Sequence, residues 1–156
     1  MIPVVTPSQM ADIDEQAVEP IEVLIKKAGQ AVAWRARKIL KGTYGKRVTI
    51  IVGKGNNGAD GLEAARRLRG WGVKVHTFQS DSVPYNLKDS DLLIDAAVGT
   101  GLKRPYQAPE VSFPILSVDI PSGICGLSGD ALGIPVNADE TITFQALKTG
   151  HLLSKV

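Results

Sequence analysis

A short apolar run, followed at once by a glycine-rich loop and then a helix, constrains the fold of this chain more than any other feature. Val48–Val52 is nearly continuous in apolar and β-branched residues, and Gly53, Gly55 and Gly58 come directly after it. Such a run is typical of a parallel strand buried on both faces. Helical spacing of apolar residues resumes over about Asp60–Arg69, where we expect Leu62, Ala65 and Leu68 to face inward. Strand, tight turn and helix in this order predict an α/β fold.

Four more segments have the pattern of strands, which makes the expected sheet five strands wide. They are Val73–Phe78, Leu92–Ile94, Ile115–Val118 and Thr141–Phe144. Strands that alternate with helices favour an open, doubly wound, mostly parallel sheet in a three-layer αβα arrangement. The sequence has no internal repeat, low-complexity tract or linker. We therefore expect residues 1–156 to form a single domain.

Two helices are predicted before the first strand of the sheet. Thr6-Pro7-Ser8-Gln9 has the pattern of a capping box, and a short helix should follow to about Glu15. A longer helix begins near Pro20 and ends at Gly42 and Gly45. We interpret its apolar stripe as core packing; the stripe consists of Ile21, Leu24, Ile25, Ala28, Val32, Ala36 and Ile39.

Two connections between predicted strands lack the pattern of a helix. Gln79–Ser90 contains Pro84, and Leu102–Pro114 contains three prolines. Parallel crossovers usually carry a helix, and parallel sheets are normally covered on both faces. These shortened crossovers predict that part of the sheet is bare in the isolated chain and is covered by a second copy or by another domain.

Charge and composition exclude several classes of protein. The net charge is only +2, and the small basic clusters fall on predicted helices, where a solvated face is the ordinary interpretation. We expect no nucleic-acid partner. No apolar run approaches the roughly 18 residues that a membrane span needs, so we expect no membrane association. The single Cys125 excludes an internal disulfide, and residues 1–5 lack the pattern of a secretory signal. A cytoplasmic location is therefore expected.

Three glycine- and polar-rich segments follow predicted strands and should meet at one edge of the sheet. They are Gly53–Gly61, Asp95–Leu102 and Asp119–Gly123. Ligands of open α/β sheets bind beyond the carboxyl ends of the strands. The pattern Gly53-x-Gly55-x-x-Gly58 lets a backbone approach a pyrophosphate at a helix N-terminus, although a tight turn without a ligand has the same pattern.

Polar side chains in these segments suggest more than turn formation. Asp95 and Asp119 each end a strand, where an Asx-type turn is the alternative interpretation. Carboxylates beside an asparagine pair and Ser122 make a set of oxygen ligands that suits a non-transition cation. His76 and Cys125 have no spacing typical of a zinc site.

These motifs together resemble those of a known family, the NAD(P)H-hydrate epimerases (the YjeF amino-terminal domain family). The similarity covers almost the whole chain and includes Thr143-Phe144 with Lys148-x-Gly150. The resemblance implies a Rossmann-like fold, usually a homodimer, that interconverts the R and S epimers of hydrated NADH and NADPH in nicotinamide nucleotide repair.

The resemblance also implies which residues hold the ligands. The substrate would be bound by Asn56, Asn57, Gly58, Ala59, Asp60, Gly99, Thr100, Gly101, Leu102, Lys103, Arg104, Pro105 and Asp119. A potassium ion would be held by Asn57, Asp95 and Ser122. Residue chemistry alone does not select potassium over sodium or magnesium, and Lys103 and Arg104 are equally consistent with surface charge.

The chain departs from the family pattern in three ways. Ala59 stands where the family more often has glycine, and the two short connections lack helices. The chain also stops at Val156, where family members continue with a further strand. It therefore resembles the N-terminal part of bifunctional proteins that also carry an ADP- or ATP-dependent dehydratase domain, and such a domain, fused or associated, would cover the bare face.

The chemistry implied by the resemblance needs a group that donates and then removes a proton, which a carboxylate can do. We assign that role to Asp119, with Asp60 as the second candidate. One alternative is a nicotinamide-dependent oxidoreductase domain, because Asp81 lies about 20 residues beyond the glycine motif, where a ribose-binding acid belongs. Another alternative is a catalytically silent nucleotide-binding scaffold.

Overall fold

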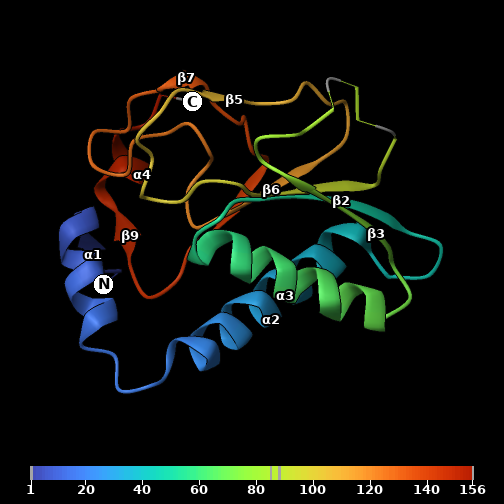
Figure 1. Cartoon of the computed structure of the whole chain (residues 1–156), viewed down its shortest axis with the longest axis horizontal. Helices are drawn as coiled ribbons and strands as arrows, with labels where there is room; N and C mark the ends of the chain where they lie inside the picture. The colour runs from blue at the N-terminus through green and yellow to red at the C-terminus, as the bar shows by residue number, and fades with distance from the viewer. Residues whose placement is uncertain (1, 85, 88, 156) are drawn as a thin grey trace.

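A parallel β-sheet organises the molecule. The computed structural model describes residues 2–84, 86–87 and 89–155, and within them the main sheet has the strand order β3-β2-β4-β6-β8 (Figure 1). Its strands are β2 (Arg47–Val52), β3 (Lys74–Gln79), β4 (Leu92–Ala96), β6 (Ile115–Val118) and β8 (Glu140–Ile142). Every neighbouring pair is parallel. The expected α/β, doubly wound, Rossmann-like class is confirmed.

The order of the strands reverses between β2 and β4. The chain passes from β2 outward to β3 and then crosses back to β4, so the carboxyl ends of β2 and β4 lie at a switch point. Val52 pairs with Ala96, and the Gly53 N–H continues the ladder with a 3.0 Å bond to the Ala96 carbonyl. Crevices at such points are the usual ligand sites of open α/β sheets.

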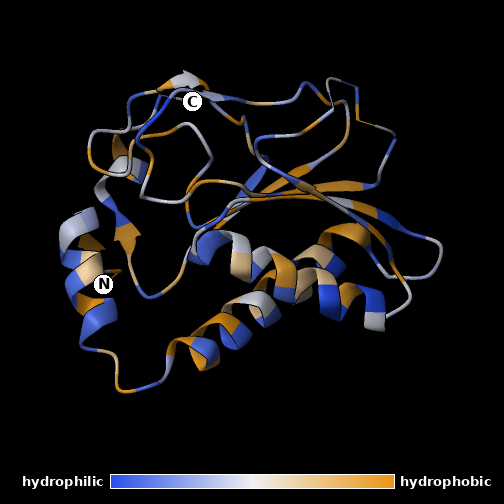
Figure 2. Ribbon diagram, viewed as in Figure 1, coloured by the Kyte–Doolittle hydropathy of each residue, from blue (hydrophilic) through white to orange (hydrophobic). Residues whose placement is uncertain are grey.

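Two long helices, α2 (Ile21–Leu40) and α3 (Asn56–Gly70), cover one face of the sheet (Figure 1). Between them and the sheet lies the larger of two apolar cores, in which Val32, Ile50, Leu68 and Ile94 are fully buried. Figure 2 shows the strands as largely hydrophobic, as expected for strands buried on both faces.

In the part of the chain that the structure describes, loops rather than helices cover the opposite face of the sheet (Figure 1). Ile51 and Leu93 on this face are fully buried, packed with apolar side chains that include Leu102 and Phe113. Within the loop layer, β5 (Tyr106–Gln107) pairs with β7 (Gly133–Ile134). The prediction of a bare face, to be covered by a partner, is therefore wrong, because the extended connections themselves carry enough apolar residues to cover it.

The predicted helices form, and the start of α3 is shifted. The capping box is present: Gln9 N–H donates to Thr6 Oγ1 at 3.2 Å, and Thr6 N–H donates to Gln9 Oε1 at 2.9 Å, at the start of α1 (Pro7–Glu15). Helix α3 starts at Asn56, four residues before the expected Asp60, so the motif residues form its first turn. Leu62, expected to face inward, is 47% exposed.

A small two-stranded sheet lies beside α1 and was not predicted. Strand β1 (Val4–Val5) pairs in parallel with β9 (Leu147–Lys148), and the short helix α4 (Thr149–Leu153) follows (Figure 1). Strands of two residues leave no periodic pattern in a sequence. Among the described residues, no helix combines the length and the apolar character that crossing a bilayer requires.

The close approach of the β2 and β4 ends generates a stability prediction. A Cβ on Gly53 would overlap the carbonyl oxygen of Ala97, whereas a Cβ on Gly55 would meet no heavy atom of the described chain within 4 Å. We expect Gly53→Ala to lower the free energy of unfolding by about 1–3 kcal/mol or more, as for an overpacked core. Gly55→Ala meets no steric overlap and should lower it by less, roughly 0.5–1 kcal/mol, the cost of alanine in place of glycine at a helix N-cap. Urea denaturation measures both, and equal stability of the two variants would contradict the expected close approach.

Candidate functional site

A cavity of about 810 Å³ lies at the carboxyl ends of β2 and β4. Its wall combines the glycine loop before α3, the loop after β4, the residue after β6, and parts of α1, α2 and the segment before β9. The polar residues on this wall include Asp14, Asn56, Asn57, Asp60, Thr100, Arg104, Asp119, Gln145 and Lys148. The segments expected to meet at the sheet edge thus contribute to one cavity.

The first turn of α3 lies at the cavity wall. Gly55 is the N-cap residue, and Asn56 and Asn57 occupy the first helical positions. A Cβ on Gly58 would overlap the Gly53 carbonyl oxygen, so glycine is needed there for the turn to close. Because the first amides of a helix lack intrahelical acceptors, this turn favours a negatively charged group such as a phosphate.

The side chain of Asn57 is buried without a partner. Within the described part of the chain, neither its Oδ1 nor its Nδ2 has a hydrogen-bond partner, although both atoms are shielded from solvent. An unsatisfied buried polar group costs about 1–3 kcal/mol. Such a group at a cavity wall indicates a place where a ligand or an ion supplies the missing contacts.

Asp95 lies behind the cavity wall and connects the ends of strands β4 and β6. Its fully buried carboxylate accepts hydrogen bonds from Ser117 Oγ (2.8 Å), from Ser122 Oγ (2.6 Å) and N–H (2.9 Å), and from Ala97 N–H (3.3 Å). Burial raises the pKa of Asp95, and these hydrogen bonds oppose the rise. Ser122 Oγ also accepts from the Val98 N–H at 2.8 Å. Asp95 and Ser122 thereby hold the loop after β4 in place.

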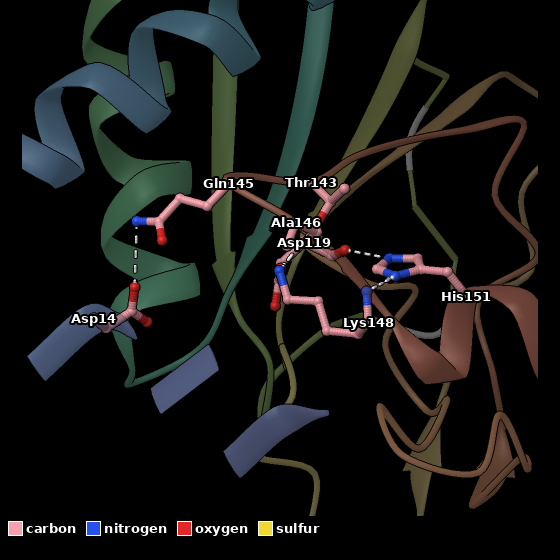
Figure 3. Close-up of polar contacts among 7 residues, drawn as sticks. All are labelled: Asp14, Asp119, Thr143, Gln145, Ala146, Lys148 and His151. Carbon is pink, nitrogen blue, oxygen red and sulfur yellow. Dashed lines mark hydrogen bonds and ion pairs between the residues drawn. The ribbon is translucent and has the colours of Figure 1, made fainter. Parts of the chain in front are cut away.

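Asp119 is held in an unusual backbone conformation at the centre of the site. Its φ is +69°, a region that non-glycine residues rarely adopt. Its N–H donates to the Ile142 carbonyl at 2.7 Å, and its own carbonyl accepts from His151 Nε2 at 2.7 Å. The carboxylate forms an ion pair with Lys148 Nζ at 2.5 Å (Figure 3).

Two further carboxyl groups, those of Asp14 and Asp60, lie near Asp119. Burial, followed by the negative charges of Asp119 and Asp14, raises the pKa of Asp60 to about 7. Burial also raises the pKa of Asp14, whose Oδ1 accepts a 3.4 Å hydrogen bond from Gln145 (Figure 3). The site thus combines an ion-paired carboxylate with a carboxyl group that is half protonated near neutral pH, an arrangement suited to proton transfer.

Part of the α2 stripe lines the cavity instead of the core. Val32 and Ala36 are fully buried as expected, but Ile21, Leu24, Ile25 and Ala28 face the cavity together with Met10 and Phe144. The core interpretation was therefore wrong for the first half of α2. These side chains form an apolar wall opposite the polar turn, as in most small-molecule sites.

The structure divides the remaining sequence-predicted residues into two groups. Gly99, Thr100, Gly101 and Arg104 line the cavity with the residues described above. Five others are outside the cavity wall: Gly58, Ala59, Leu102, Lys103 and Pro105. Leu102 packs into the core under the loop layer, and Lys103 and Pro105 are exposed. Asp81 does reach the wall, where it forms an exposed ion pair with Lys54 at 3.5 Å.

Several site residues were missed from the sequence. Asp14 and Met10 come from the N-terminal helix, and Gln145, Lys148 and His151 come from the segment after β8. For Lys148 a signal existed, because Lys148-x-Gly150 is one of the motifs on which the family resemblance rests. For the others, no local pattern marks a residue that reaches the site only through tertiary packing.

The fold and the site define a Rossmann-like α/β protein with a glycine-rich turn and a cavity at its switch point. A family model described as "YjeF-related protein N-terminus" matches residues 21–86 and 77–150. The chain belongs to this family.

Individual relatives agree with the family match. The NAD(P)H-hydrate epimerase of Limosilactobacillus fermentum is 32% identical over 94% of this chain and 87% of its own length. The bifunctional NAD(P)H-hydrate repair enzyme Nnr of Escherichia coli is 32% identical over 85% of this chain, but over only 32% of its own length. The crystal structure of the yeast protein ynu0 superposes with a TM-score of 0.82 and 24% identity, covering 99% of this chain and 85% of that one, which shows a shared fold.

The raised pKa of Asp60 predicts a pH-dependent stability. The folded protein binds this proton more tightly than the unfolded chain, whose carboxyl has the ordinary value of 3.8. The binding of this proton therefore contributes its full stabilisation of the folded state below about pH 4, and this stabilisation is lost as the pH rises through about 7. Asp60→Asn, which cannot ionise, should raise the free energy of unfolding relative to wild type more near pH 8 than near pH 5.

Urea denaturation at the two pH values measures this difference. Asp12→Asn, at an exposed position of α1, is the matched control. It should change the free energy of unfolding by the same small amount at both pH values. A pH-independent effect of Asp60→Asn would show that the folded state does not favour the protonated carboxyl group.

Proposed function

We propose that this protein is a NAD(P)H-hydrate epimerase that interconverts the R and S forms of hydrated NADH and NADPH. The observation that carries the proposal is the pair of carboxyl groups at one cavity: Asp119, ion-paired with Lys148, and Asp60, with a pKa of about 7. The names of the relatives from L. fermentum and E. coli support it.

The reaction needs one proton donated to the departing hydroxyl and one proton removed from the water that adds in its place. The hydrated ring carries a hydroxyl on a carbon next to the ring nitrogen. When that hydroxyl is protonated, the C–O bond breaks, the nitrogen lone pair forms a C=N double bond, and water leaves. Water then adds to the other face, loses a proton to the protein, and returns the electron pair to nitrogen. A carboxyl group beside the carbon can donate the first proton and remove the second.

The site provides groups for both ends of a dinucleotide. Asp119 is assigned as the acid and base at the reacting carbon, and the partly protonated Asp60 is the second candidate for the donor. The first turn of α3 and Arg104 would bind phosphate oxygens. The apolar wall, with Leu24 and Phe144, suits the flat face of a nicotinamide ring and excludes water from it.

We further propose that a potassium ion binds beside Asn57. The free Oδ1 of Asn57 fits a hard cation that prefers oxygen ligands. Each Asp95 oxygen already accepts hydrogen bonds, so Asp95 would act by orienting Ser122, whose Oγ is the second candidate ligand. When bound, the cation would supply positive charge close to the phosphate-binding turn.

Association with a second copy or with a dehydratase domain stays a proposal. The chain spans most of the L. fermentum relative but about a third of the bifunctional one. Because loops already cover the second face of the sheet, such a partner would bind at another surface.

The first functional test concerns Asp119. We expect the wild type to speed the equilibration of the two epimers, followed by chromatography, and Asp119→Asn to slow it by about 10²–10⁴-fold. Nucleotide affinity should change little, because Asn keeps the size of the side chain. Tight nucleotide binding without any acceleration by the wild type would instead favour a silent scaffold, and hydride transfer to a substrate would favour an oxidoreductase.

The second test removes the cation. Replacing potassium by tetramethylammonium should weaken dinucleotide binding to the wild type, measured by calorimetry, because the phosphates lose a nearby positive charge. The Asn57→Ala variant should bind more weakly and should no longer respond to potassium. Undiminished wild-type affinity without potassium, sodium or magnesium would contradict a cation site, and restoration by sodium as well would contradict selectivity for potassium.

A further inference from the structure

We infer that Lys148 and His151 are positioning residues that direct one oxygen of the Asp119 carboxylate into the cavity. The inference rests on the proposed function, since it explains how the acid–base group of that reaction is held. It concerns two residues to which neither the sequence motifs nor the relatives assign a role.

Lys148 holds one side of the Asp119 carboxylate. Its side chain is only 3% exposed, and its Nζ donates to Asp119 Oδ1 at 2.5 Å and to Thr143 Oγ1 at 2.9 Å. Thr143 Oγ1 also donates to Asp119 Oδ1 at 3.3 Å. A buried ammonium needs such partners, because an unpaired charge in this position would be costly. The contacts with Lys148 and Thr143 therefore fix the position of Asp119 Oδ1.

The other carboxylate oxygen, Oδ2, is directed at the cavity. A Cβ placed on Gly99 would lie 3.2 Å from Asp119 Oδ2 and 3.6 Å from the side chain of Asn57. Both neighbours line the cavity. The contacts of Lys148 thus leave Oδ2 facing the glycine turn after β4, where the substrate is proposed to react.

His151 holds the backbone of the same residue. Its Nδ1 accepts a hydrogen bond from the Lys148 N–H at 2.9 Å, so the ring proton belongs on Nε2. Nε2–H then donates to the Asp119 carbonyl at 2.7 Å (Figure 3). One ring therefore connects the backbones of Lys148 and Asp119, and it supports the left-handed conformation of Asp119 (φ +69°).

The two positioning residues are themselves fixed from outside the main sheet. Lys148 lies in β9, where it pairs with Val5 of β1. The following residue, Thr149, donates from Oγ1 to the Gly126 carbonyl at 3.2 Å and to the Leu127 carbonyl at 2.9 Å. Contacts on both sides restrict the position of the segment, so the direction of the Asp119 carboxylate depends on the N-terminal strand as well as on the sheet.

The test compares two replacements of His151 in the full chain. His151→Phe keeps the ring but removes both hydrogen bonds, and we expect kcat to fall roughly 10–100-fold with KM nearly unchanged, because a catalytic group displaced by about 1 Å loses rate in this range. His151→Gln can still donate to the Asp119 carbonyl and should recover most of kcat. His76→Phe, at an exposed position of β3, is the matched control and should leave kcat unchanged.

Lys148 is tested together with Asp119, because removing one partner of a buried ion pair can unfold a protein. Lys148→Met should lower kcat, and the double variant Lys148→Met/Asp119→Asn should be no slower than Asp119→Asn alone, since Lys148 acts through Asp119. Thermal unfolding shows whether each variant is folded. If the double variant is slower than Asp119→Asn by the same factor by which Lys148→Met is slower than the wild type, Lys148 acts independently of Asp119. That result would overturn the inference.

A further measurement separates this inference from the proposed function. If the wild type does not accelerate epimerisation, the proposed function fails, and a crystal structure of His151→Phe still tests the positioning. In that structure Asp119 should leave its left-handed conformation and Oδ2 should turn away from Gly99. An unchanged Asp119, or wild-type kcat in His151→Phe, would overturn the inference.

Discussion

The site depends on the buried carboxylate of Asp95. A charged or neutral carboxyl group without exposure to water is costly unless its oxygens are hydrogen-bonded, and Asp95 obtains its partners from Ser117 in β6 and from Ser122 and Ala97 in two loops. These bonds fix the ends of β4 and β6 relative to each other. The loop after β4 and the turn containing Asp119 consequently lie at the same cavity, although about 20 residues separate them.

The cavity is formed partly by the main sheet with α3 and partly by segments outside the main sheet. The parallel sheet places the α3 turn at the switch point and Asp119 at the end of β6, the strand next to β4. Segments outside the main sheet then complete the site: α1 supplies Asp14, and β9 supplies Lys148, which pairs with Asp119. The sheet therefore determines where chemistry can occur, and the added segments determine the charge and direction of the carboxyl groups there.

The sequence predicted the sheet and its polar edge well, for a physical reason. Continuous apolar runs such as Val48–Val52 are needed to bury a strand on both faces, and the glycines that follow are needed where backbones approach closely. The cover of the second face was predicted wrongly, since extended loops bury apolar residues such as Phe113 without any periodicity. Leu62 and the first half of α2 were misplaced because helical spacing identifies an apolar face but not what that face contacts.

By itself, the sequence determined the α/β class, the glycine turn after the first strand of the sheet and the aspartates that end two strands, because each depends on local patterns of apolar residues, glycines and aspartates. Only the tertiary structure decided that burial raises the pKa of Asp60 to about 7 and that Lys148 and His151 contact Asp119. The pKa of a side chain depends on its burial and on its distance to other charges, and its direction depends on its contacts. Folding sets all of these, because it brings together residues that lie far apart in the sequence.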